Sequence, residues 1–346
     1  MKYQVSYFKH SLQFKKTSRT SRGELNTHES YIIKLTANNL IGYGEAAPLK
    51  GLSIDYVDLF DQHLNHFCQL INDGFPIHKI DFTEFPSIDF AFETAMLGIK
   101  NQQPFKLFDS PFYEGIGIDI NGLVWMNNTE QMLGDAFKKI EEGFTCIKFK
   151  VGAQDFDEEC RMLERLRKVV TANQIEIRLD ANGAFNDDDV RQKLNDLKRF
   201  EIHSIEQPIK PKQIDLMQEI SAISPIPIAL DEELIGVSVM EEGNTLLKFI
   251  KPHYIILKPT LLGGLTKSNS WIKLANKLEI GWWATSALES NIGLNAIAQW
   301  CSTYQLKMPQ GLGTGSLYTN NIASPLQIKN GKIQYKQGSS WIIPTE

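Results

Sequence analysis

Three stretches decide the fold, namely EIRLDAN (residues 176–182), IHSIEQP (residues 202–208) and IPIALDE (residues 226–232). Each is a short run rich in β-branched and apolar residues that leads to an acid, which is Asp180, Glu206 or Asp231. Such runs predict buried strands. From Lys150 through these acids to Lys258, the steps are 30, 26, 25 and 27 residues. Because a barrel of eight strand-helix units occupies about 250 residues, or roughly 31 per unit, this spacing predicts consecutive strands of a parallel α/β barrel.

The three acids are expected to lie together at the mouth of that barrel. Each one ends its strand, and the C-terminal ends of barrel strands form the face where active sites are assembled. Carboxylates gathered there repel one another unless a cation lies between them. A ligand set of oxygens alone, without histidine or cysteine, suits a hard divalent ion, so we expect Asp180, Glu206 and Asp231 to bind Mg²⁺, with Mn²⁺ as the second choice.

Two lysine positions flank the acids. In CIKFKVG (residues 146–152), Lys148 and Lys150 are two apart on a predicted strand and therefore point the same way. The ordinary lysine pKa of about 10.4 is too high for a base near neutrality. A second ammonium and a metal cation would lower it, so Lys150 is the candidate base. Lys258, in YIILKP, comes from the strand beyond Asp231 and is expected to stabilise negative charge from the opposite side.

The order KxK, DANG, EQP, DE, LKP and SALES resembles the enolase superfamily, and within it the muconate-lactonising subgroup. The resemblance spans almost the whole chain. It implies a modified (β/α)8-type barrel, of (β/α)7β form, with an α+β capping domain. It also implies that Asp180, Glu206 and Asp231 bind Mg²⁺, that Lys150 is the acid/base with Lys148 in support, and that Lys258 is the opposite lysine.

The last third of the chain narrows the expected reaction. TSALESNIGLNAIAQW (residues 285–300) and PQGLGTGSLYTNN (residues 309–321) resemble the dehydratases of menaquinone biosynthesis within that subgroup. The resemblance implies a lyase that converts 2-succinyl-6-hydroxy-2,4-cyclohexadiene-1-carboxylate to o-succinylbenzoate through an enediolate. N-acylamino-acid racemases and dipeptide epimerases are the alternative. The epimerases carry an Asp-x-Asp pair in the stretch where this chain has Gly311-Leu312-Gly313-Thr314, which leaves a cationic dipeptide without an obvious anchor.

Two hypotheses of other kinds explain less. An aldolase with Lys258 as its Schiff-base lysine would leave the three carboxylates without a role. A barrel that only binds or scaffolds would leave the whole set of acids and lysines without one.

The order of elements also predicts the domains. Strand-like runs followed by helical stretches, including residues 87–99, begin the chain. We expect an N-terminal α+β capping domain in residues 1–110, the barrel in residues 111–315, and a C-terminal segment in residues 316–346 that completes the cap.

The resemblance implies that two loops of the cap, residues 17–28 and 47–53, face the substrate. The first loop provides Arg22 as a candidate for gripping a substrate carboxylate, and the second provides Leu49 and Leu52 as apolar walls. In the barrel, Ser286 follows the seventh strand and is a candidate for hydrogen bonding to the substrate. Asn182, two residues after Asp180, is expected to orient a metal ligand or the substrate.

The composition is that of a globular protein and argues against nucleic-acid-binding and membrane-spanning classes. The chain has 346 residues, 42% hydrophobic and 22% charged, which is ordinary for a globular enzyme. A net charge of −5 argues against a nucleic-acid surface. The N-terminus lacks the apolar core of a signal peptide, no run is long enough to span a bilayer, and the four cysteines show no paired spacing. We therefore expect a cytoplasmic enzyme that acts on a small carboxylate. Its oligomeric state has no signal in the sequence.

Overall fold

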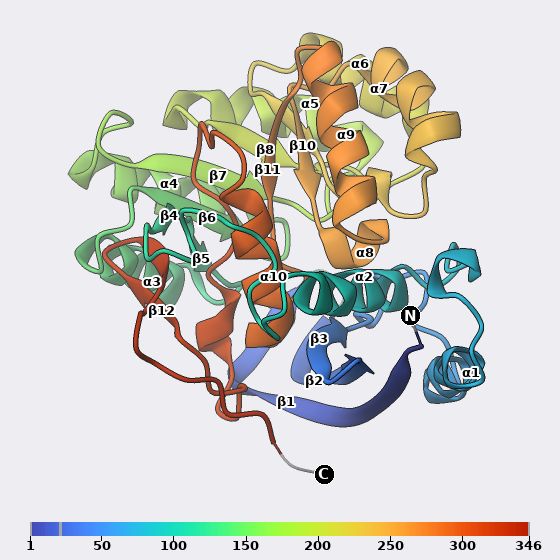
Figure 1. Cartoon of the computed structure of the whole chain (residues 1–346). Helices are drawn as coiled ribbons and strands as arrows, with labels where there is room; N and C mark the ends of the chain where they lie inside the picture. The colour runs from blue at the N-terminus through green and yellow to red at the C-terminus, as the bar shows by residue number, and fades with distance from the viewer. Residues whose placement is uncertain (1, 21–22, 345–346) are drawn as a thin grey trace.

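The computed structural model describes residues 2–20 and 23–344. Its first part is an antiparallel sheet covered by two helices, and its second part is a parallel barrel, with the helix α2 between the two (Figure 1). In the described residues, no helix is long and apolar enough to cross a membrane.

The N-terminal sheet has the order β1-β2-β3 and packs against α2. Glycines make this packing possible, because a Cβ at Gly42 would lie 1.9 Å from the backbone oxygen of Ala95, and one at Gly44 would lie 1.8 Å from that of Ala91. The predicted strands and the predicted helix in this part are confirmed. The elements are β1 (Gln4–Thr20), β2 (Gly23–Ala37), β3 (Leu40–Ala46), α1 (Phe60–Asn72) and α2 (Pro86–Lys100).

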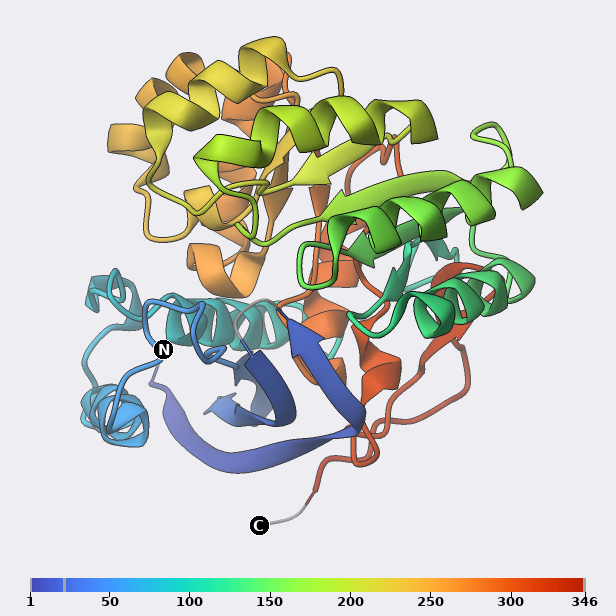
Figure 2. The ribbon, with the colours of Figure 1, turned by 180° about the vertical axis from the view of Figure 1, so that it is seen from behind.

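The expected loop at residues 17–28 is largely strand. β1 and β2 pair as far as Thr20 and Gly23, with a register shift between Gln13 and Ser18. Long alternating strands satisfy their backbone groups by pairing, which a loop of this length would not do. Figure 2 shows the far end of this hairpin reaching up to the barrel.

The barrel consists of seven strand-helix units closed by bridges at residues 310–311, in agreement with the predicted (β/α)7β form. Its parallel strands follow one another in chain order. They are β5 (Gly122–Val124), β6 (Cys146–Lys150), β7 (Glu176–Asp180), β8 (Ser204–Glu206), β9 (Ile228–Leu230), β10 (Tyr254–Leu257) and β11 (Gly281–Ala284). The helices are α3 (Thr129–Glu141), α4 (Phe156–Val169), α5 (Asp187–Leu197), α6 (Ile214–Ile223), α7 (Asn244–Ile250), α8 (Pro259–Leu262), α9 (Leu265–Lys277) and α10 (Asn291–Cys301).

Residues 310–311 close the barrel. Gly311 forms a parallel bridge with Thr285, which follows β11, and Gln310 forms a parallel bridge with Ile120, which precedes β5. The backbone nitrogen of Gly311 donates to the oxygen of Ala284 over 2.7 Å. The two ends of the seven-stranded sheet are therefore joined through two residues.

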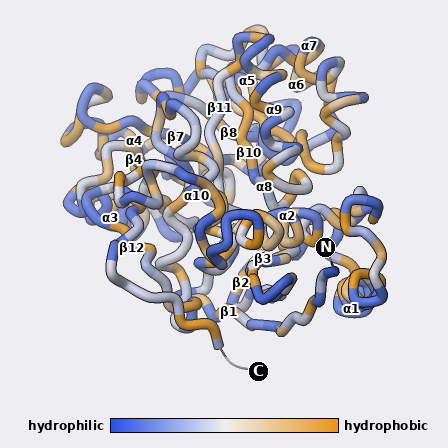
Figure 3. Tube along the Cα trace, viewed as in Figure 1, coloured by the Kyte–Doolittle hydropathy of each residue, from blue (hydrophilic) through white to orange (hydrophobic). Residues whose placement is uncertain are grey.

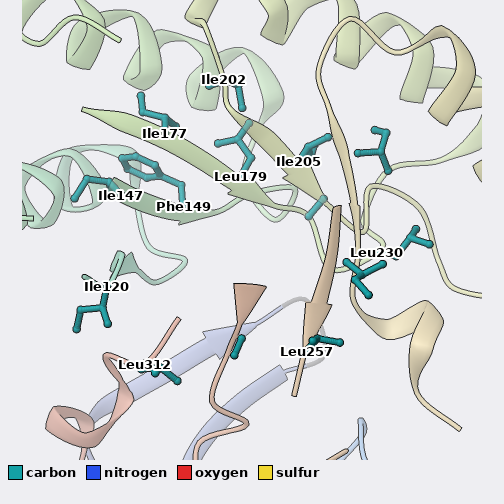
Figure 4. Close-up of a cluster of buried hydrophobic side chains, with 14 of the residues drawn as sticks. Ile120, Ile147, Phe149, Ile177, Leu179, Ile202, Ile205, Leu230, Leu257 and Leu312 are labelled. Atoms are coloured by element: carbon teal, nitrogen blue, oxygen red, sulfur yellow. The ribbon is translucent and has the colours of Figure 1, made fainter. Parts of the chain in front are cut away.

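Alternation along the strands separates the core from the site. In β6, Ile147 and Phe149 belong to the core cluster between strands and helices, which Figure 4 shows, whereas Lys148 and Lys150 point into the barrel. The outer helices alternate hydrophilic and hydrophobic stretches along the chain, as amphipathic helices do (Figure 3).

Two acids, the buried Glu45 and the half-buried Glu93, attach the N-terminal part to the barrel. Glu45 of β3 accepts from the backbone nitrogens of Ser290 (2.6 Å) and Gly293 (2.7 Å) at the start of α10. Glu93 of α2 accepts from Leu265 N (2.5 Å) and Thr266 N at the start of α9. Carboxylates at helix N-termini satisfy unpaired N–H groups and favour the helix dipole. These contacts hold the cap beside the barrel mouth.

The C-terminal segment contacts both parts. Its strands β12 (Leu326–Lys329) and β13 (Lys332–Tyr335) form a sheet with β4 (Ile118–Asp119). Tyr318 bridges to Phe14 of β1, and Trp341 stacks on Phe105 with ring centroids 4.2 Å apart. The domain boundaries at residues 110 and 315 stay predictions.

Candidate active site

The acids and lysines meet at the ends of neighbouring strands. Lys150 is in register with Asp180, and Asp180 with Glu206, across β6, β7 and β8. Asp231 follows β9 directly, and Lys258 follows β10. None of the six side chains, Lys148 included, belongs to a residue more than 9% exposed. The structure thus brings together the predicted metal ligands and both lysine positions.

Every acid of this group pairs with a lysine. Lys148 Nζ lies 2.8 Å from Asp180 Oδ2 and also pairs with Glu206 Oε2. Lys150 Nζ lies 2.5 Å from Asp180 Oδ2, and Lys258 Nζ pairs with Asp231 Oδ2. Pairing is required because an isolated charge is very costly to bury.

The pKa values of the two lysines of β6 shift in opposite directions. Burial and the neighbouring Lys148 ammonium hold the pKa of Lys150 below its ordinary value, although Asp180 opposes them. Burial also acts to lower the pKa of Lys148, but Asp180, Glu206 and Asp231 outweigh it and raise that pKa. The lowered pKa expected for Lys150 is confirmed in direction, with burial as its first cause.

Burial and the negative charge of Asp180 raise the pKa of Glu206 well above its ordinary value. For Asp180, burial acts in the same direction, but Lys148 and Lys150 overcome it and lower the pKa. Burial and Asp180 thus disfavour the charged form of Glu206, and a further positive charge nearby would favour it.

The donor set fits a divalent cation. Glu206 Oε1 is buried and has no hydrogen-bond partner among the described residues, and the donors of all three acids are the carboxylate oxygens that Mg²⁺ prefers. However, in the described part of the chain no group of three or more His, Cys, Asp or Glu side chains is arranged as a finished metal site. In this arrangement one oxygen of each acid is paired with a lysine.

Asn182 contacts the candidate base. Its Oδ1 accepts from Lys150 Nζ over 2.8 Å, and its Nδ2 donates to Glu232 Oε1 over 2.9 Å. Asn182 has a positive φ of 44°, a conformation that asparagine tolerates better than most residues. This geometry supports a role in orienting Lys150.

A cavity of about 270 Å³ opens in front of the lysines. Leu49 and Leu52 of the cap line it, as expected, and so do residues 23–25 at the end of the hairpin. Arg22 lies outside the described residues. The barrel residues that line the cavity are Asn121, Leu123, Trp125, Lys148, Lys150, Lys258, Thr285, Ser286, Ala287, Leu288, Gly311, Gly313 and Thr314.

The hydroxyl of Ser286 lines this cavity but is engaged within the protein. It donates to Glu289 Oε2 and accepts from Thr314 Oγ1 over 2.7 Å. Sequence reasoning did not predict four polar barrel residues of the cavity, which are Asn121, Trp125, Thr285 and Thr314. Asn121 and Trp125 flank β5, and alternation in NGLVW (residues 121–125) gives them the same side, but that signal is recognisable only once the closure through residues 310–311 is known.

The profile of the enolase C-terminal domain-like family matches residues 131–339, more than half of the chain. This chain belongs to the enolase superfamily. The family resemblance carried by the acids, the lysines and the barrel spacing is therefore confirmed.

Individual members of the superfamily cover nearly the whole chain. The o-succinylbenzoate synthase of Desulfotalea psychrophila is 40% identical over 95% of this chain and 98% of its own length. The crystal structure of MenC from the same organism has a TM-score of 0.86 and 37% identity, and covers 96% of this chain and 100% of that chain. A dipeptide epimerase from Enterococcus faecalis, complexed with Mg and a dipeptide, has a TM-score of 0.82, covers 97% of both chains and is 21% identical, which shows the shared fold alone.

Proposed function

We propose that this protein is an o-succinylbenzoate synthase of menaquinone biosynthesis in the cytoplasm. It would dehydrate 2-succinyl-6-hydroxy-2,4-cyclohexadiene-1-carboxylate to o-succinylbenzoate. The observation that carries the proposal is that Lys150 and Lys258 line one cavity from strands β6 and β10, with the three acid-bearing strands between them. The 40% identity to a protein of that name supports the choice among superfamily reactions. The four free, buried cysteines support a reducing compartment.

Lys150 is the acid/base in this proposal. Its amine takes the proton α to the substrate carboxylate, and the resulting ammonium returns a proton to the departing hydroxyl, so that water leaves and the ring becomes aromatic. Asn182 holds the Lys150 amine by the 2.8 Å hydrogen bond. Lys148 keeps its charge beside Asp180 and Glu206 and favours the neutral form of Lys150.

Lys258 faces the same cavity from the other side and keeps its proton. Burial acts to lower its pKa, but Asp231 and Glu232 outweigh burial and raise it. A fixed ammonium at this position stabilises the negative charge that develops on the substrate when the α-proton leaves.

Asp180, Glu206 and Asp231 would hold Mg²⁺, or Mn²⁺ in its place. When bound, the cation supplies a Lewis acid for the substrate carboxylate and fixes its orientation.

The test is direct. The purified chain is mixed with Mg²⁺ and the hydroxycyclohexadiene substrate generated in situ, and the loss of substrate absorbance is followed with an EDTA control. Rapid, metal-dependent formation of o-succinylbenzoate is expected. No conversion by folded, Mg²⁺-loaded protein would contradict the proposal, and α-proton exchange in D₂O with N-acylamino acids and dipeptides would then test the racemase and epimerase alternative.

A further inference from the structure

The barrel closes on a side of the cavity that carries no charge. We call this side the closure seam, and it comprises residues 120–125, Thr285 and residues 310–311. Its bridges join Ile120 to Gln310 and Thr285 to Gly311. Gly311 is needed there, because a Cβ at this position would lie 2.4 Å from Thr285 Oγ1. The glycine leaves space for the threonine side chain at the cavity wall.

Three side-chain atoms of the closure seam have no hydrogen-bond partner in the described residues. They are Asn121 Oδ1, Trp125 Nε1 and Thr285 Oγ1, and each atom is buried. The Asn121 side chain is itself almost fully buried, in a residue that is 4% exposed. All three residues line the cavity that Lys150 and Lys258 also line. These three unpartnered atoms thus fall on one wall of one cavity.

The buried charged and hydroxyl side chains elsewhere in the same cavity are paired within the protein. The three buried lysines are paired with acids, and Thr314 donates to Ser286, which donates to Glu289. A buried polar atom without a partner destabilises a fold. Partnerless atoms concentrated on a cavity wall therefore point to partners provided by a ligand.

We propose that the closure seam binds the carbonyl oxygen of the substrate's side arm. This assignment rests on the proposed function and identifies what holds the succinyl group beyond the reacting ring. Trp125 Nε1 is a donor only, and the Thr285 hydroxyl donates as well, so the pair suits an acceptor oxygen. The Asn121 amide adds a third donor when it turns by 180°, because its oxygen and nitrogen exchange places.

The seam suits a neutral carbonyl better than a carboxylate. None of its residues is charged, and a carboxylate buried on neutral donors would keep much of its desolvation cost. Among the described residues that line the cavity, the cations are Lys148, Lys150, Lys258 and the exposed Lys50 of the cap. In this proposal the exposed Lys50 would meet the terminal carboxylate of the arm.

The experiment compares two ligands by calorimetry in the presence of Mg²⁺. The first is o-succinylbenzoate, and the second is 2-(3-carboxypropyl)benzoate, in which a methylene replaces the arm carbonyl. We expect the wild-type protein to bind the first about tenfold more tightly, the effect of one or two neutral hydrogen bonds.

Thr285→Val and Trp125→Phe should each reduce this ratio of affinities several-fold, while Thr285→Ser and the remote Trp341→Phe should retain it. In turnover, the two seam variants should raise KM more than they lower kcat.

Thermal stability provides a readout that does not depend on the ligand. Thr285→Val removes an unpartnered hydroxyl and should keep or raise Tm, by about 1 to 2 °C. Its matched control, Thr314→Val, removes a hydroxyl that is bonded to Ser286 and should lower Tm. A lowered Tm for Thr285→Val would show a structural hydroxyl and overturn the proposal.

The possible failures are distinguishable. If the wild-type protein turns over its substrate but binds both ligands equally, or if neither seam variant changes the ratio, the seam assignment is wrong and the proposed function stands. If the wild-type protein neither turns over the substrate nor binds o-succinylbenzoate, the proposed function is wrong. The assignment of the side-arm carbonyl to the closure seam is then wrong as well.

Discussion

The two sides of the barrel mouth differ in how far their buried polar groups are paired within the protein. On the charged side, from β6 to β10, each of the three acids is paired with a lysine. On the closure seam, three neutral polar atoms have no partner in the described residues. An unpaired buried charge is far more costly than an unpaired hydroxyl or amide. Reactive charges must therefore be balanced inside the protein, whereas neutral recognition groups can remain without a partner until a ligand binds.

Removing Lys150 should have the largest effect. We expect Lys150→Ala to lower kcat by about 10²- to 10⁴-fold, because the acid/base is lost. Turnover is measured by substrate absorbance, and folding by circular dichroism. Lys248→Ala, on the exposed face of α7, is the control and should be unaffected. Near-normal turnover in Lys150→Ala would contradict the mechanism.

Lys258 should matter almost as much, for an electrostatic reason. We expect Lys258→Ala to lower kcat by about 10²- to 10³-fold, in the range of other lost charge-stabilising groups. The variant also leaves Asp231 without its paired ammonium. Lys258→Arg keeps the charge and should recover part of the rate. Equal defects in the two variants would mean that the position requires the lysine shape and not its charge.

Glu206→Gln tests the metal ligands of the charged side. We expect the affinity for Mg²⁺, measured by calorimetry, to fall at least about tenfold, since a neutral amide replaces a hard anionic donor. Glu176→Gln changes an acid at the opposite end of the neighbouring strand β7 and should leave Mg²⁺ affinity unchanged. Similar affinity in both variants would remove Glu206 from the ligand set.

The cap should contribute to binding more than to chemistry. Leu52→Ala shortens an apolar side chain at the cavity wall, so we expect KM to rise about three- to tenfold through lost apolar contact, with kcat little changed. Leu70→Ala, on α1 and away from the cavity, is the control. An unchanged KM in Leu52→Ala would mean that the substrate does not reach this wall.

Ser286 is a useful contrast to the adjacent Thr285, because the Ser286 hydroxyl is hydrogen-bonded within the protein and the Thr285 hydroxyl is not. Ser286→Ala removes the donor to the buried Glu289 carboxylate, and we expect the free energy of unfolding to fall by ~1–3 kcal/mol. Its effect on KM should be smaller than that of Thr285→Val. Denaturant titration and steady-state kinetics measure the two quantities. A larger KM effect for Ser286→Ala would make Ser286 the principal contact with the substrate.

Local patterns made the strands and the chemical residues predictable. Short apolar runs ended by Asp180, Glu206 and Asp231 recur at the length of a strand-helix unit, and parallel strands bring their ends together. The alternation in β6 likewise predicted that Lys148 and Lys150 share a face. In contrast, residues 17–28 read as a loop from their polar composition, but their described residues, 17–20 and 23–28, belong to the paired strands β1 and β2, because each strand satisfies the backbone of the other.

By itself, the sequence determined the barrel, the family and the identity of the acids and lysines, because these depend on periodicity and residue type along the chain. Only the tertiary structure decided how the barrel closes through residues 310–311, how Glu45 and Glu93 attach the cap, and which polar atoms remain without partners. Those features depend on contacts between segments far apart in the sequence. Whether a side chain such as Thr285 or Ser286 is satisfied is settled by its neighbours in space, and adjacent residues in the chain can differ completely in that respect.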